Sequence, residues 1–318
     1  MSRTNSVFLR FIVAILLLAA WFASGWLAAR PCPDRAFLSG LCAAAVILGN
    51  GVLLFFLNER VMSGASVLVF LFYIVLSTAN PAALYFSRFH AAALLLAGSF
   101  ACYARFNALN PSMKDLCGAW LLLGIAALLE PPFLWLAPVY ALTSAGKAEN
   151  KPKFIAATLL FLILPAAAWI GFRYLRGEAS PALYFLGTMW DGMTALRRPS
   201  FQLSAPTLCR ILVTAIACIL AAVRILRRLD SYRISQYRAS IRLIIMTISL
   251  CLLVVLFYAG GGASGSVGGG IPSGLVVLLP VSLMLGEYTG PSRSRPSGRT
   301  MAAFLLLFLL AERISCFV

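Results

Sequence analysis

The sequence predicts an all-α fold, a polytopic transmembrane helical bundle, from its composition, its long apolar runs and the basic segments between them. Of the 318 residues, 61% are hydrophobic and only 11% are charged, whereas a soluble domain carries about a quarter charged residues. The apolar runs are continuous, unlike the alternating segments of about ten residues that build a membrane β-barrel. Because hydrocarbon offers no partner for the backbone polar groups, continuous apolar runs predict helices that cross a bilayer.

Each apolar run marks one expected span, and residues 1–318 are expected to form a single integral membrane domain. The first run follows Ser2 and Arg3, as in a signal peptide, but bulky Trp21 and Trp26 near its end favour a retained span. The expected spans are 11–29, 37–57, 63–79, 90–106, 115–129, 132–145, 154–172, 208–226, 241–259, 271–288 and 300–316.

The spans 115–129 and 132–145 are short and are separated by Glu130-Pro131-Pro132. About 15 residues of helix cover about 22 Å, less than the ~30 Å hydrocarbon core. Two successive prolines end a helix at the residue before them. The sequence therefore predicts a short-helix hairpin or re-entrant pair with Glu130 at its tip, which gives eleven spans. The alternative is one kinked helix, which gives ten.

The distribution of basic residues predicts the orientation. With a cytoplasmic N-terminus and eleven spans, 17 of the 26 Lys and Arg residues fall on the inner side, as expected for a multi-pass protein of a bacterial inner membrane. The densest basic loop, 224–242, is then inside and the C-terminus outside. The net charge of +16 is assigned to inner loops and anionic lipid heads, so the bilayer is the expected partner and nucleic acid is not.

One outer loop, 173–207, is long. Its segment 181–196 carries apolar and aromatic residues at helical spacing, including Tyr184 and Trp190. This pattern predicts a short amphipathic helix that lies in the membrane interface with both rings at headgroup depth.

The expected outer side gathers the candidate functional residues. A carboxylate among arginines at a membrane surface suits a base beside a lipid phosphate. The alternative is that these side chains are solvated loop charges or salt bridges that contribute little. The candidate catalytic residues are Asp34 and Glu130, of which Glu130 is fixed by the prolyl hairpin, and the candidate lipid-phosphate ligands are Arg88, His90, Arg173 and Arg176.

No cofactor or metal site is expected. The chain has a single His, and none of its eight cysteines forms a Cys-x-x-Cys pair. The inner acids are expected to be structural. Asp115, for example, suits the positive end of a helix dipole where a helix starts.

The segments Asn80-Pro81, Phe86–His90 and Gly118–Gly124, followed by Glu130-Pro131-Pro132, resemble an uncharacterised family of bacterial polytopic inner-membrane proteins. The resemblance extends to a basic, tyrosine-containing loop, Tyr232–Arg238, and to a proline in the span after it, Pro280. It implies an integral membrane protein of the cell envelope.

Residues 87–142 are also similar to the membrane core of type C glycosyltransferases, which use polyprenyl-phosphate-linked sugars. Gly118–Gly124 and the break at Glu130 match their pattern, and Asp34 lies in the first outer loop, where those enzymes place a catalytic acid. That loop is long in the enzymes and short here.

The resemblances imply a non-catalytic, glycosyltransferase-like scaffold or accessory subunit of envelope biogenesis, whose partner is an envelope protein or a lipid-linked glycan. The alternatives are an active membrane glycosyltransferase and a transporter of small molecules or lipids.

Overall fold

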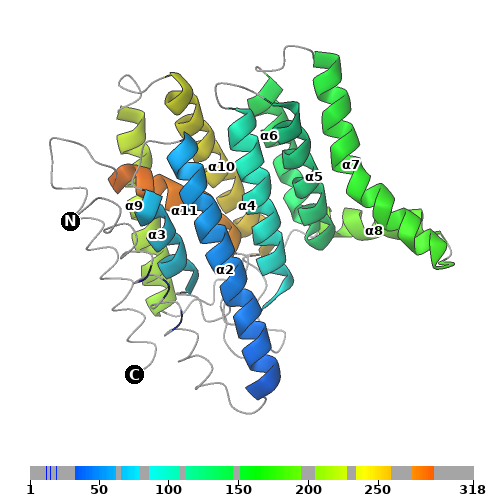
Figure 1. The fold of residues 1–318 in the computed structure, drawn as a ribbon, viewed down its shortest axis with the longest axis horizontal. Coiled ribbons are helices and arrows are strands. Elements are labelled where there is room, and N and C mark those ends of the chain that lie inside the picture. Colours follow the sequence, from blue (N-terminus) through cyan, green and yellow to red (C-terminus); the bar gives the residue numbers. More distant parts are fainter. Residues whose placement is uncertain are drawn as a thin grey trace.

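The computed structural model describes residues 33–61, 66–78, 86–107, 112–145, 151–178, 180–194, 205–227, 234–258 and 274–289, together with 12, 15 and 19. Every element in these ranges is a helix (Figure 1), which confirms the predicted all-α fold class. The expected spans 11–29, apart from those three residues, and 300–316 lie outside the described residues. The elements are α2 (Pro33–Val61), α3 (Ser66–Thr78), α4 (Arg88–Phe106), α5 (Met113–Leu129), the 3-10 helix η2 (Pro131–Trp135), α6 (Leu136–Ser144), α7 (Lys151–Leu175), α8 (Pro181–Thr194), α9 (Ala205–Arg227), α10 (Ile234–Tyr258) and α11 (Gly274–Thr289).

Three of the described helices are long and apolar enough to cross a membrane: Leu38–Glu59 within α2, Arg88–Phe106 and Lys151–Leu175. Shorter apolar helical stretches lie in α3, α10 and α11. At 1.5 Å per residue, the 19 residues of α4 extend over about 28 Å, close to the thickness of a hydrocarbon core. The chain is therefore a helical membrane protein.

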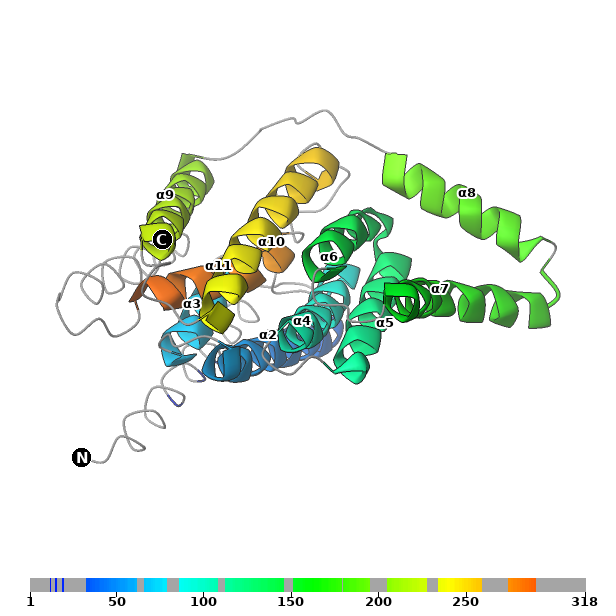
Figure 2. The same cartoon turned by 90° about the horizontal axis from the view of Figure 1, so that it is seen from above.

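The antiparallel pair α4 and α5 forms the centre of the bundle. In Figures 1 and 2, α2, α3 and α11 lie on one side of this pair and α7 lies on the other. Small residues bring the two central helices together, because a Cβ atom on Gly98 would lie 3.1 Å from Leu122 and one on Gly118 would lie 3.2 Å from Cys102 Sγ. Helices in lipid associate through close approach at small residues, because the burial of apolar surface provides little driving force there.

Polar groups also join neighbouring helices inside the bundle. Asn50 Nδ2 of α2 donates to Tyr73 OH of α3 at 3.0 Å, and both side chains are buried. Ser99 Oγ of α4 donates to the Ala119 carbonyl of α5 at 2.7 Å. Such contacts replace the water that buried polar groups lose and fix how the helices face one another.

The predicted break at Glu130 is present, and the chain returns on itself there. Helix α5 ends at Leu129 and Glu130 is extended, with φ −141° and ψ 95°. The prolines open a 3-10 helix rather than the α-helix expected from 132 onward, because α6 begins only at Leu136. The return is seen at Tyr140, whose ring lies 5.9 Å from that of Trp120 and 4.3 Å from that of Tyr103. The hairpin interpretation is confirmed over the single kinked helix.

Helix α7 bends at Pro165, a residue inside the helix. A proline lacks the backbone N–H and crowds the preceding turn, which kinks a helix. Figure 2 shows the first half of α7 end-on beside α5 and the second half leaving the bundle sideways. Helix α8 then runs back across the direction of the spans (Figure 1).

Two loop assignments are corrected. Asp34 was expected in an outer turn but lies in the first turn of α2, where a preceding proline and an acidic residue both favour a helix start. Arg238, expected in the inner loop 224–242, lies within α10, which also contains Arg242 of the expected span 241–259. Long arginine side chains are tolerated in the end turns of a span because they reach the interface.

Candidate functional site at the Glu130 end of the bundle

One end of the bundle gathers the start of α4, the end of α5, η2 and α8. The Phe86 N–H just before α4 donates to Ser39 Oγ of α2 at 2.7 Å, which places the start of α4 beside the N-terminal part of α2. The expected outer residues 34, 88, 90 and 130 therefore belong to the same end of the bundle, as the predicted topology requires.

Arg88 and Glu130 form an ion pair between Arg88 Nε and Glu130 Oε1. The Glu130 side chain is only 4% exposed, whereas that of Arg88 is 67% exposed. The sequence predicted Glu130 at the rim of the bundle, with a solvated loop charge as the alternative. The solvated alternative is wrong, because the side chain is buried. A carboxylate at that depth requires a partner because burial disfavours its charge.

The two residues of this pair lie at helix ends, and only Arg88 is in a clearly unfavourable electrostatic position. Arg88 is the first residue of α4 and Glu130 is the C-cap of α5. A helix N-terminus carries a partial positive charge and a C-terminus a partial negative one. Arg88 therefore lies at the helix end that repels it. Glu130 lies between two ends, because it is also the N-cap of η2, where a negative charge is favoured. The attraction between the two side chains offsets the cost at Arg88.

His90 is fully buried in the third position of α4. Its Nδ1 accepts from the Ser87 N–H at 3.3 Å and lies 3.1 Å from Ser87 Oγ. This is a capping box in which His takes the place of the usual Glu or Gln. Because Nδ1 accepts from the backbone, the ring proton is assigned to Nε2. Its expected role at a lipid phosphate stays a prediction.

Arg173 and Arg176 lie together at the far end of α7. Arg173 Nη1 is 3.0 Å from Glu178 Oε2, and its guanidinium lies over the rings of Trp169, at 4.4 Å, and Tyr184, at 5.0 Å. The Arg176 guanidinium lies 4.5 Å from the Phe172 ring centre. Cation–π contacts of this kind hold both groups close to aromatic surface.

The structure separates the predicted residues into two groups. Arg173 meets Tyr184 near the start of α8, and Pro131 meets Gly192 near its end. These two positions in α8 are about 12 Å apart along the helix axis. Arg88, His90 and Glu130 form one group, and Arg173 and Arg176 form the other. The Asp34 side chain lies outside the described residues, so its predicted catalytic role beside Glu130 stays a prediction.

Helix α8 docks on the prolyl turn. A Cβ atom on Gly192 would lie 2.7 Å from Pro131, and Trp135 Nε1 donates to the Met193 carbonyl at 3.4 Å. Sequence reasoning did not find this contact, although a glycine near the end of an amphipathic segment is a signal of close packing.

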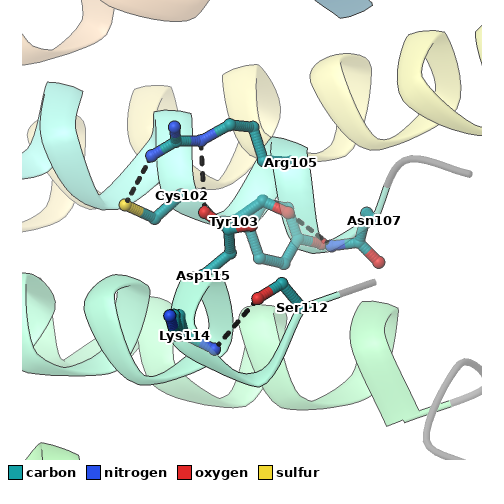
Figure 3. Close-up of polar contacts among 7 residues, drawn as sticks. All are labelled: Cys102, Tyr103, Arg105, Asn107, Ser112, Lys114 and Asp115. Atoms are coloured by element: carbon teal, nitrogen blue, oxygen red, sulfur yellow. Dashed lines mark hydrogen bonds and ion pairs between the residues drawn. The ribbon is translucent and has the colours of Figure 1, made fainter. Parts of the chain in front are cut away.

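The opposite end of the α4–α5 pair carries a second ion pair (Figure 3). Arg105 Nε lies 3.2 Å from Asp115 Oδ1, and Arg105 Nη2 also contacts Cys102 Sγ at 3.5 Å. Here Arg105 is in the last turn of α4 and Asp115 in the first turn of α5, so both charges suit the helix dipoles. The structural role predicted for Asp115 agrees with this geometry.

Further contacts tie this end to α6 and α10. Asn107 Nδ2 donates to the Tyr103 carbonyl at 2.9 Å, Arg242 Nη1 donates to the Asn107 carbonyl at 3.3 Å, and the hydroxyls of Tyr103 and Thr143 are hydrogen-bonded. These contacts close the end of the bundle opposite to Glu130.

Comparisons of the chain with protein-family models, with curated proteins and with solved structures find no match. Among the described residues, no group of three or more His, Cys, Asp or Glu side chains is arranged to hold a metal ion. The fold and the site thus define an all-α membrane protein whose predicted ionisable residues lie in two groups at one end.

Proposed function

We propose that this chain is a non-catalytic scaffold or accessory subunit of cell-envelope assembly in a bacterial inner membrane. Its N-terminus is cytoplasmic, and the end of the bundle that carries Glu130 faces outward. Its partner is another envelope protein or a lipid-linked glycan. The membrane class follows from the fold, and the charge distribution of the sequence supports the orientation.

The Arg88–Glu130 pair is the observation that carries the non-catalytic interpretation. A general base must come within hydrogen-bond reach of the proton that it removes. The carboxylate of Glu130 is enclosed and already engaged by a guanidinium. Arg173, a predicted phosphate ligand, is likewise engaged by Glu178 and two rings. These charges support the fold of the outer end, as expected in a scaffold.

One observation favours a second candidate, an active glycosyltransferase that uses a polyprenyl-phosphate-linked sugar. Arg88 opposes the α4 dipole and Glu130 is a buried carboxylate, and charges that cost stability are typical of functional sites. In this alternative the donor phosphate replaces Glu130 at Arg88, and the released carboxylate acts as the base. A transporter has less support, because the middle turns of the described helices carry no Asp, Glu, Lys or Arg.

Purification from source membranes in mild detergent, followed by a sugar-transfer assay with a polyprenyl-phosphate-linked donor, tests the proposal. A scaffold is expected to retain an envelope protein in a fixed ratio and to transfer no sugar by itself. Glu130→Gln is expected to leave that ratio unchanged. A solitary protein that transfers sugar would overturn the proposal, and loss of this activity in Glu130→Gln but not in the control Asp115→Asn would establish the enzyme.

A further inference from the structure

The α7–α8 elbow, residues 169–190 apart from Ala179, is the part of the described structure that stands furthest from the core. Its turn is made by two residues in the left-handed region, Gly177 with φ 77° and Ser180 with φ 56°. Helix α8 leaves this turn across the direction of the spans (Figure 1), beside the outward half of α7 (Figure 2). A helix that crosses the spans at one end of a bundle lies along the membrane surface.

Helix α8 has a packed face and, opposite to it, an apolar face. Pro181 and Phe185 are buried against the protein. Leu183, Leu186 and Trp190 follow the i, i+3, i+7 spacing of a single helix face and are 72%, 62% and 65% exposed.

A third face of α8 is more polar. Tyr184, Thr188 and Asp191 follow an i, i+4, i+7 spacing on the remaining side of the helix. An interfacial helix at the edge of a membrane protein has this division: one face toward protein, one toward hydrocarbon and one toward headgroups.

The elbow also carries cations at headgroup depth. Arg173 and Arg176 with Glu178 give a net charge of +1 if each is fully ionised. The guanidinium of Arg173 is held between Trp169 and Tyr184, and aromatic residues of these types gather at the membrane interface. Glu178 neutralises Arg173 at 3.0 Å, and Arg176 is exposed.

We propose that the elbow binds the phosphate of anionic phospholipid headgroups through Arg176 and Arg173, while Leu183, Leu186 and Trp190 enter the hydrocarbon beneath. The inference goes beyond the proposed function, because it holds whether the outer end serves a scaffold or an enzyme. We favour lipid over a protein as the ligand of this surface. Cations and interfacial aromatic residues border one continuous apolar face, and an anionic bilayer surface is complementary to that pattern. Glu178 limits the affinity by holding Arg173.

Native mass spectrometry of the full-length protein in detergent tests the proposal, with short-chain phosphatidylglycerol and phosphatidylcholine titrated separately. We expect tighter binding of phosphatidylglycerol. Arg176→Gln is expected to weaken that binding roughly fivefold, which is about 1 kcal/mol. Glu178→Gln is expected to tighten it by roughly the same factor, because it frees Arg173.

Two controls give the test its specificity. Arg176→Lys keeps the charge and is expected to retain most of the affinity. Lys153→Gln removes a charge at the other end of α7 and is expected to weaken phosphatidylglycerol binding less than Arg176→Gln does. Equal affinity for the two lipids would overturn the proposal, as would weaker binding in Glu178→Gln. Competition by inorganic phosphate alone would assign the site to a free anion. Phosphatidylglycerol binding that no elbow variant alters would also overturn the proposal.

Discussion

At the scale of single residues, the two ion pairs that close the α4–α5 pair are chemically alike but differ in the position of the arginine and in burial. Arg105–Asp115 places each charge at the helix end that attracts it, and both side chains are partly exposed. Arg88–Glu130 places the arginine at the end that repels it and the carboxylate between the end of α5 and the start of η2, and only the carboxylate is buried. The second pair is therefore asymmetric. Removal of Arg88 leaves a buried carboxylate, whereas removal of Glu130 leaves an exposed guanidinium.

This asymmetry predicts unequal costs for the two single substitutions. Arg88→Gln leaves the enclosed carboxylate without its guanidinium and is expected to cost about 3 kcal/mol or more. Glu130→Gln leaves an exposed arginine that water and lipid heads solvate, so it is expected to cost less than about 1 kcal/mol. Thermal unfolding in detergent measures both. Equal costs for the two variants would contradict the burial of Glu130.

Residue-level prediction from the sequence was partial for a physical reason. The Glu-Pro-Pro triplet located Glu130 at a turn because proline chemistry is local, but its burial depends on η2 and α8, which pack only in the folded chain. The ion pair with Arg88 joins two helix ends that are remote in sequence. The capping role of His90 was visible as Ser87-x-x-His, although the usual pattern has Glu or Gln at the last position.

At the scale of elements, helix α7 is held to the bundle where it bends. A Cβ atom on Gly124 of α5 would lie 2.8 Å from the Leu162 carbonyl oxygen and 3.0 Å from Pro165. The absence of a side chain at Gly124 thus lets the kinked segment of α7 approach α5. The position of α8, and of the elbow that carries Arg173 and Arg176, depends on this contact.

Gly124→Ala is therefore expected to destabilise the protein by about 1–3 kcal/mol, because the added methyl meets backbone rather than a movable side chain. Gly171→Ala in α7 is the matched control, since nothing lies within 4 Å of a Cβ atom at that position. It is expected to be neutral or stabilising by up to about 1 kcal/mol through helix propensity. Unfolding temperatures in the same detergent give the comparison, and a Gly124→Ala protein as stable as the control would refute this contact.

Most described helices were predictable because a span is a continuous apolar run, a signal that needs no tertiary information. The residues at which these helices begin and end were harder to predict. Arg238 belongs to helix α10 although its charge suggested a loop, and Asp34 belongs to the start of helix α2. The contact between Asn50 and Tyr73 was missed, although an amide in the middle of an apolar run indicates an interhelical partner.

At the scale of the whole molecule, the surface matches lipid rather than water. Helix α7 exposes Ile155, Leu159, Leu160 and Ile163 along its length, each by more than half of its surface, and charged groups concentrate at the helix ends. An exposed apolar surface of this extent is an aggregation hazard in water but is ordinary in a bilayer. The composition of the chain predicted this apolar surface, because the interior of a protein of this size cannot bury so many apolar residues.

Extraction of isolated membranes with alkaline carbonate distinguishes a protein that spans the bilayer from one bound only at its surface, because carbonate strips the latter. All of the chain is expected to stay in the membrane pellet and to be released only by detergent. Folded protein in the carbonate supernatant, without detergent, would contradict this expectation.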